Sequence, residues 1–208
     1  MITGRFITLE GGEGAGKSTQ IRALAAALRA RGLEVVETRE PGGSEGAEAI
    51  RAMLLTGGAD RWNARAEALL FAAARADHIE KTIRPALTRG AWVLSDRFLD
   101  SSRAYQGQGE LSDADILALH QIGSAGFLPD RTLFLTLPET EAEARAHARD
   151  GDVSDRIGGR DRSFHRAVAD AFVRFAADEP ARVRAIDASG AAEGVTARLL
   201  AALDDLLS

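Results

Sequence analysis

The chain has 208 residues, a formal net charge of −5 and no cysteine. That length fits one domain over residues 1–208, and the lack of cysteine excludes disulfides and thiolate metal sites. No block of like charge indicates a nucleic-acid surface, no apolar run approaches the roughly 20 residues of a membrane helix, and the first residues lack a signal-peptide pattern. We therefore expect a cytoplasmic protein without nucleic-acid or membrane partners.

Short β-rich runs alternate with helical patterns along the chain. The runs lie at residues 5–10, 33–38, 91–96, 132–137 and 183–188. Helical patterns lie at residues 18–31, 44–55, 64–89 with a bend near Pro85, 101–106, 112–126, 139–149, 163–177 and in a final amphipathic stretch. Gly32 is placed to end the first helix, and Asn63 and Ser112 are placed to begin later ones. This alternation predicts a three-layer α/β fold with a five-stranded parallel sheet flanked by helices.

A glycine-rich loop lies between the first predicted strand and the first predicted helix. Its sequence, GGEGAGKS, fits the P-loop pattern and comprises Gly11, Gly12, Glu13, Gly14, Ala15, Gly16, Lys17 and Ser18. Backbone N–H groups in such a loop converge on phosphate oxygens, which side chains would obstruct. Only Lys17 and Lys81 of the 26 basic residues are lysine, so the loop lysine is unlike the rest of the chain. A plain glycine turn is the alternative, but the flanking strand and helix favour ATP binding, with Lys17 on the phosphates and Ser18 on Mg²⁺.

The ends of the second and third predicted strands carry further charged residues. The second strand ends in TREPGG, with Arg39 and Glu40, and the third ends in SDRF, with Asp96 and Arg97. Ligands of open parallel sheets bind beyond the carboxyl ends of the strands, so these side chains should share a crevice with the P-loop. An aspartate at such a strand end suits Mg²⁺ or its water. A surface ion pair remains the alternative interpretation of Asp96–Arg97.

Five motifs together resemble those of bacterial thymidylate kinases. They are EGGEGAGKST, TREPGG, LLFAAARADH, SDRF…SSRAYQG and SDRI, in an order and spacing similar to that family from about residue 6 to residue 177. The resemblance implies a P-loop nucleoside monophosphate kinase that phosphorylates dTMP to dTDP with ATP and Mg²⁺. It also implies a homodimer formed through helix faces.

The resemblance implies roles for particular residues. Phe71 matches an aromatic that stacks on thymine, although its helical position alone favours a core residue, and Arg75 lies one helical turn further on. Arg97 matches the residue that binds the monophosphate, with Arg39 nearby. The remaining acceptor positions are Ser102 at the base edge and Tyr105 and Gln106 near the sugar. Glu13 matches an acid that contacts the 3′-hydroxyl or the metal shell, and Asp96 and Ser18 are the expected metal ligands.

Residues 149–162 resemble the mobile lid that covers ATP in this fold. The segment contains glycines and the arginines Arg149, Arg156, Arg160 and Arg162. The P-loop offers no arginine to the transferring phosphoryl group, so the lid is expected to supply one. Arg156, in the SDRI motif, matches the family best and is assigned a catalytic role; solvated loop charges are the alternative.

Two other functions remain open from the sequence. One is a kinase for another nucleoside monophosphate, with the same fold and different pocket residues. The other is a P-loop nucleotide switch or ATPase without a small-molecule acceptor. An assay for ADP formation that depends on added dTMP would distinguish these two functions from that of a dTMP kinase.

Overall fold

The structure is a computed structural model that describes residues 4–58, 60–138, 140–141, 145, 156 and 159–207. The strands are β1 (Phe6–Glu10), β2 (Val35–Arg39), β3 (Trp92–Asp96), β4 (Arg131–Thr136) and β5 (Val183–Asp187). The helices are α1 (Lys17–Ala30), α2 (Glu45–Leu55), α3 (Ala64–His78), the π-helix η1 (Ile79–Ile83), α4 (Arg84–Thr88), α5 (Leu99–Gln106), α6 (Asp113–Ser124), α8 (Arg162–Asp178), α9 (Ala192–Ala201) and α10 (Asp204–Leu207). Among these helices, none combines the length and apolar character needed to cross a membrane.

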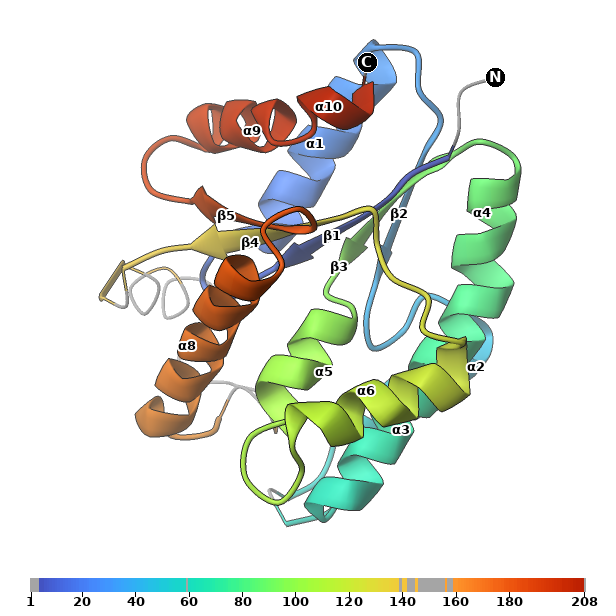
Figure 1. The fold of residues 1–208 in the computed structure, drawn as a ribbon, viewed down its shortest axis with the longest axis vertical. Helices are drawn as coiled ribbons and strands as arrows, with labels where there is room; N and C mark the ends of the chain where they lie inside the picture. The colour runs from blue at the N-terminus through green and yellow to red at the C-terminus, as the bar shows by residue number, and fades with distance from the viewer. Residues whose placement is uncertain are drawn as a thin grey trace.

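The strands form one sheet in the order β2-β3-β1-β4-β5, with every pairing parallel. The carboxyl ends of β1, β2 and β3 are in register, since Leu9 pairs with Asp96 and Arg39 also pairs with Asp96. Figure 1 shows helices on both sides of this sheet. The predicted three-layer fold with five parallel strands is therefore confirmed, and the strand ends that carry the motifs lie side by side.

Alternation along β1 assigns its residues to the two sides of the sheet. Ile7 and Leu9 pack in a core with α1 and α9, whereas Phe6 packs in a second core with residues of α3, η1, α4, α5 and α6. Side chains two residues apart on a strand share a face, so Thr8 and Glu10 lie on the side of Phe6. Both are completely buried. A carboxyl group thus enters the protein interior beneath α5.

The predicted helix starts are confirmed at the capping residues. The side chain of Asn63 accepts a hydrogen bond from the Ala66 amide (2.8 Å), and Ser112 forms a reciprocal capping box with Asp115. Gly32 takes a left-handed φ of 82° after α1, as a helix C-terminus requires. The final helix is interrupted after Ala201, and the predicted helix at 139–149 lies mostly outside the described residues.

The long helix predicted over residues 64–89 is three segments. α3 ends at His78, five residues form the π-helix η1, and α4 follows. Pro85 cannot donate a backbone hydrogen bond, and its ring would clash with the carbonyl group four residues earlier. The wider π turn just before it accommodates this conflict. The bend predicted near Pro85 is therefore present as a local change of helix type.

Candidate active site

The main cleft among the described residues lies at the carboxyl ends of β1, β2 and β3. Its lining includes most of the predicted site residues, namely Glu13, Gly14, Ala15, Gly16, Lys17, Ser18, Arg39, Phe71, Arg75, Asp96, Arg97, Ser102, Tyr105 and Gln106. Gly11 and Gly12 lie behind this lining, where their carbonyl groups accept hydrogen bonds from the Lys17 ammonium group (3.0 and 2.8 Å). The structure thus brings the P-loop and the predicted acceptor residues to one cavity.

Lys17 combines a positive charge with burial at the start of α1. Gly16, with φ 88°, precedes α1 in a left-handed conformation that glycine adopts without steric cost. Burial, followed by repulsion from Arg97, lowers the pKa of Lys17 to about 8. The N-terminus of α1 faces the same cavity with its unpaired amides. An anion with several oxygens, such as a polyphosphate, would relieve the cost of burying this ammonium group.

The residues expected to hold Mg²⁺ are in contact. The Ser18 hydroxyl donates to Oδ2 of Asp96 (3.1 Å), and Oδ1 of Asp96 is buried with no hydrogen-bond partner among the residues that the structure describes. No group of three or more His, Cys, Asp or Glu side chains that could hold a metal is found among the described residues. Mg²⁺ in kinases is commonly held by one or two protein oxygens together with substrate phosphates and water. One unpaired carboxylate oxygen beside a P-loop serine fits that requirement.

Arg97 occupies a strained turn between β3 and α5. Its φ is 70°, in the left-handed region, where a non-glycine residue costs about 1–3 kcal/mol. Its guanidinium group lies 5.0 Å from the centroid of the Tyr105 ring and donates to the Ser101 hydroxyl (3.0 Å). Because such strain persists only where the surroundings enforce it, the direction of this side chain is fixed by the fold.

The end of the cleft where the base of the acceptor was predicted to bind is a buried polar cluster. Arg75 is 3% exposed and donates to Glu40 (2.8 Å), to the Phe98 carbonyl oxygen (3.2 Å) and to the Ser102 hydroxyl (2.7 Å). The second oxygen of Glu40 is 3.0 Å from Nδ1 of His78, so one carboxylate joins two side chains of α3. Phe71 lines the cavity on the same helix and is half-buried.

Arg39 lies at the exposed rim of this end. Its side chain is 55% exposed and pairs with Glu48 of α2 (3.1 Å). Such an exposed ion pair is weak, so Arg39 can leave it for a stronger anion.

A second polar cluster joins the far end of the cleft to α2 and α3. Glu67 is 3% exposed and accepts from Gln106 (3.0 Å) and Arg160 (2.9 Å). It also pairs with Arg156, whose guanidinium group donates to the Leu54 carbonyl oxygen (2.8 Å). The structure therefore places Arg156 in the protein interior, outside the cleft lining. The Tyr105 hydroxyl, by contrast, is buried, and no described residue forms a hydrogen bond with it.

Comparison with known proteins identifies the family. The thymidylate kinase family model matches residues 9–199. A thymidylate kinase of Rhizorhabdus wittichii is 67% identical over 207 residues, which cover 99% of this chain and 100% of that protein. The chain belongs to the thymidylate kinase family. A second relative, a thymidylate kinase of Bradyrhizobium sp., is 50% identical over 93% of this chain and 86% of its own length.

The fold is also that of a solved thymidylate kinase. The crystal structure of thymidylate kinase from Ehrlichia chaffeensis matches with a TM-score of 0.74 and 30% identity, over 97% of this chain and 99% of the other. The resemblance noted in the sequence motifs thus holds at the level of the family and of the whole fold.

Part of the lid predicted for this thymidylate kinase fold lies outside the described residues. Arg149, for example, is not described, whereas Arg156, Arg160 and Arg162 are. Arg160 lies between Glu67 and the Phe164 ring, which is 4.6 Å from the guanidinium carbon. The lid therefore stays a prediction.

Several cleft residues were not predicted as site residues. Arg51 and Arg145 line the cavity, and so do Ala188 and Gly190 after β5. The strand-end rule that located Asp96 also applies to the end of β5, and could have indicated the last two. Glu10 and Glu67 are buried acids that were not predicted, and their signal is a charged residue within an apolar strand or helix. Glu40, which was predicted to share the crevice, does line the cleft.

Proposed function

We propose that this chain transfers the γ-phosphoryl group of Mg²⁺-ATP to the phosphate of dTMP, yielding ADP and dTDP. The observation that carries the proposal is that one cleft contains both a P-loop and the Phe71, Arg75 and Arg97 side chains in a member of the thymidylate kinase family. A nucleotide switch needs no second anion site opposite its P-loop. The nucleophile is a phosphate oxygen, which is already anionic, so no strong general base is required.

On the donor side, the P-loop amides and Lys17 bind the ATP phosphates. Ser18 and Asp96 hold Mg²⁺, which when bound neutralises phosphate charge and orients the leaving group. Glu13 lines the cleft, and its proposed contact is the acceptor sugar or the metal shell. Lys17 faces the phosphates with a charge that burial has made costly, which favours an anionic ligand.

On the acceptor side, Arg97 binds the monophosphate through its guanidinium fork, and Arg39 joins it from the rim. Phe71 stacks on the thymine ring, while Arg75 and Ser102 contact its polar edge. Tyr105 and Gln106 lie beside the sugar. The unpaired hydroxyl of Tyr105 and the fixed guanidinium group of Arg75 support a preformed pocket that orients the base before reaction.

Arg156 is proposed as the cation that contacts the transferring phosphoryl group. Its pairing with Glu67 means that it must leave the protein interior to do so. Arg145, which lines the cleft and donates to the Ala188 carbonyl oxygen (3.2 Å), needs no such movement. Single alanine variants of the arginines in residues 145–162 distinguish these two sources.

A homodimer is proposed from large apolar side chains exposed on three neighbouring helices. Met53 on α2, Leu69 on α3 and Ile122 on α6 are 37%, 55% and 84% exposed. α3 packs against both α2 and α6, as Figure 1 also shows. Light scattering of wild type and Ile122→Glu tests this: a wild-type monomer contradicts it. The cytoplasmic location stays a prediction.

The direct test of the reaction is an ATP-coupled assay against a panel of nucleoside monophosphates. We expect dTMP to be the best acceptor and dUMP a weaker one, because loss of one methyl contact costs only about 1–3 kcal/mol. Purine monophosphates should react hardly at all. A panel led by AMP, GMP or CMP would favour a different monophosphate kinase, and ADP formation independent of any acceptor would favour an ATPase.

A further inference from the structure

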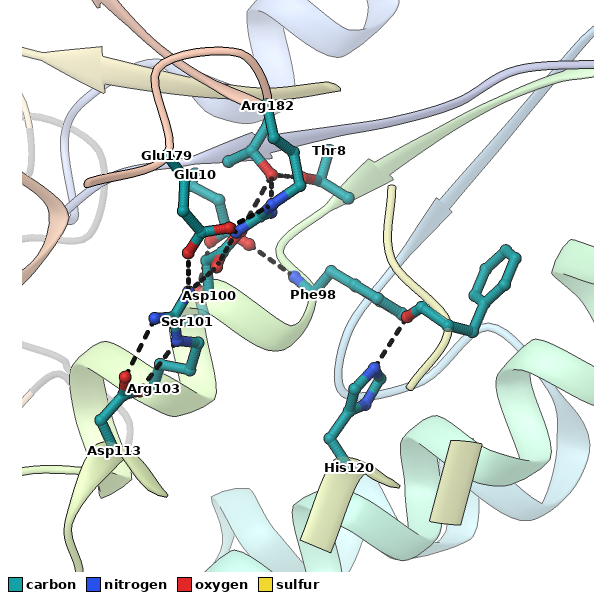
Figure 2. A network of polar contacts seen from close by, with 12 residues as sticks. Thr8, Glu10, Phe98, Asp100, Ser101, Arg103, Asp113, His120, Glu179 and Arg182 are labelled. Atoms are coloured by element: carbon teal, nitrogen blue, oxygen red, sulfur yellow. Dashed lines mark hydrogen bonds and ion pairs between the residues drawn. The ribbon is translucent and has the colours of Figure 1, made fainter. Parts of the chain in front are cut away.

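Glu10 is a buried acid beneath the acceptor phosphate site, with no part in the chemistry proposed above. It is the last residue of β1, is completely buried and faces α5. Its Oε1 accepts from the Phe98 amide (2.8 Å), and its Oε2 accepts from the Ser101 hydroxyl (2.5 Å). Figure 2 shows this side chain next to the start of α5, with one of its contacts running to Phe98.

Both contacts of Glu10 reach the strained Arg97 turn. Phe98 directly follows Arg97, so the Phe98 N–H belongs to the peptide bond between these two residues, and a hydrogen bond to it restrains the Arg97 backbone. The Ser101 hydroxyl that Glu10 fixes also accepts from the Arg97 guanidinium group (3.0 Å). The third support comes from Ser95, whose hydroxyl donates to the Arg97 carbonyl oxygen (2.7 Å). Backbone and side chain of Arg97 are thus restrained by the same carboxyl group.

We propose that Glu10 is a positioning residue for the acceptor phosphate, because it holds Arg97 in its left-handed conformation and aims the guanidinium group into the cleft. This inference rests on the proposed role of Arg97 in dTMP binding. Glu10 acts through Arg97 and does not touch the substrate.

The surroundings of Glu10 keep it in place. Asp100, one residue before Ser101, is completely buried and pairs with Arg103 of α5 (3.1 Å) and with Arg182 (2.6 Å), which ties the start of α5 to the segment between α8 and β5 (Figure 2). Burial, together with the negative charge of Asp100, raises the pKa of Glu10 to about 8. As a carboxylate, Glu10 accepts from both the Phe98 amide and the Ser101 hydroxyl. Once protonated, the carboxyl group still accepts from the Phe98 amide, and its own O–H can donate to the Ser101 oxygen in place of the second bond. Glutamine offers the same acceptor and donor, and alanine offers neither.

The test measures calorimetric binding of dTMP and of thymidine to wild type, Glu10→Ala and Glu10→Gln. Glu10→Ala should weaken dTMP binding by about tenfold or more, since a buried amide loses its acceptor and Arg97 loses its restraint. Thymidine, which lacks the phosphate, should bind with unchanged affinity. Glu10→Gln should restore most of the dTMP affinity, and ATP affinity should stay constant in all three proteins.

The opposite outcomes are equally distinct. Equal loss of dTMP and thymidine binding, or unchanged dTMP binding in Glu10→Ala, would overturn the inference. Wild type that does not bind dTMP at all would instead refute the proposed function. Leu28→Ala, in the core on the other side of the sheet, controls for lower stability without contact to the turn.

If Glu10→Ala does not fold, Ser95→Ala provides the same test from the other support. It should weaken dTMP binding and spare thymidine, and unchanged dTMP binding would count against the inference. A double-mutant cycle adds a further check. Once Arg97 is alanine, replacing Glu10 should change dTMP affinity little, whereas additive losses would show that Glu10 does not act through Arg97.

Discussion

The half of the cleft proposed to bind the phosphoryl donor is held by backbone contacts, and the half proposed to bind the acceptor is held by buried side chains. At the P-loop, Lys17 binds carbonyl oxygens only five and six residues away. At the acceptor end, Arg75 depends on Glu40, 35 residues earlier in the chain, and the Arg97 turn depends on Glu10, 88 residues before Phe98. A local loop tolerates change elsewhere in the protein, whereas an assembled pocket is sensitive to substitutions beneath its surface.

The largest expected effect tests whether a lid arginine completes the donor half. We expect Arg156→Ala to lower kcat by about 10³-fold or more, as for arginines that act in the transition state of phosphoryl transfer. The melting temperature should fall as well, because Glu67 would lose a buried ion-pair partner. Steady-state kinetics and calorimetry measure both. Normal turnover in Arg156→Ala, with a large loss in Arg145→Ala or Arg149→Ala, would assign the role to another arginine.

The next effect separates the two halves directly. Arg97→Ala should lower kcat/KM for dTMP by about 10²- to 10³-fold, and Arg97→Lys should restore little of it, because lysine lacks the bidentate fork. ATP affinity should be almost unchanged. Near-normal use of dTMP by Arg97→Ala would mean that Arg97 belongs to a surface ion pair and not to the acceptor site.

A smaller effect tests the buried support of the base end. Glu40→Gln should lower the free energy of unfolding by up to about 3 kcal/mol, because it leaves Arg75 buried without its counter-charge. Glu48→Gln is the matched control, since its partner Arg39 is exposed and the pair contributes less than about 1 kcal/mol. Urea denaturation measures both variants. Equal effects would show that burial of the acceptor end has little energetic consequence.

A separate effect is a pH dependence of stability from Glu10. Its folded pKa of about 8 lies above the ordinary value of 4.5, so the folded state binds more protons between these pH values. The stabilisation is complete below 4.5 and is lost as pH rises through 8, with a slope approaching about 1.4 kcal/mol per pH unit. Wild type should therefore lose stability relative to Glu10→Gln between pH 5 and 8 in urea denaturation. Parallel curves would contradict the raised pKa.

The fold and the donor loop could be predicted because their signals are local. The five strands, the caps at Asn63 and Ser112 and the P-loop each depend on residues within one short stretch. The strand-end rule then placed Asp96 and Arg97 correctly beside the loop. The sequence predicted a bend near Pro85 but not the π-helix, because a proline shows that regular α-helical hydrogen bonding must be interrupted without showing which local geometry replaces it.

The supports of the acceptor half could not be predicted from the sequence. Nothing in the stretch around Glu10 indicates that it binds the Phe98 amide, because that contact exists only after β1 and β3 pair. Arg156 shows the converse. Its motif resembles a family signature, yet the structure places it on Glu67, a pairing between residues 89 positions apart. Long-range pairing of buried charges depends on the assembled core, which sequence patterns do not describe.

The scarcity of lysine makes selective covalent labelling of the cleft possible. Lys17 and Lys81 are the only lysine side chains in the sequence, and an ion pair with Asp77 raises the pKa of Lys81, whereas burial lowers that of Lys17 to about 8. Near pH 8 about half of the Lys17 amine is therefore neutral and nucleophilic, while Lys81 remains an ammonium ion. A small acylating reagent should accordingly modify Lys17 before Lys81, and bound ATP should protect it. Peptide mapping after such labelling would then show, from the extent of acylation at Lys17, whether the P-loop is empty or occupied by nucleotide.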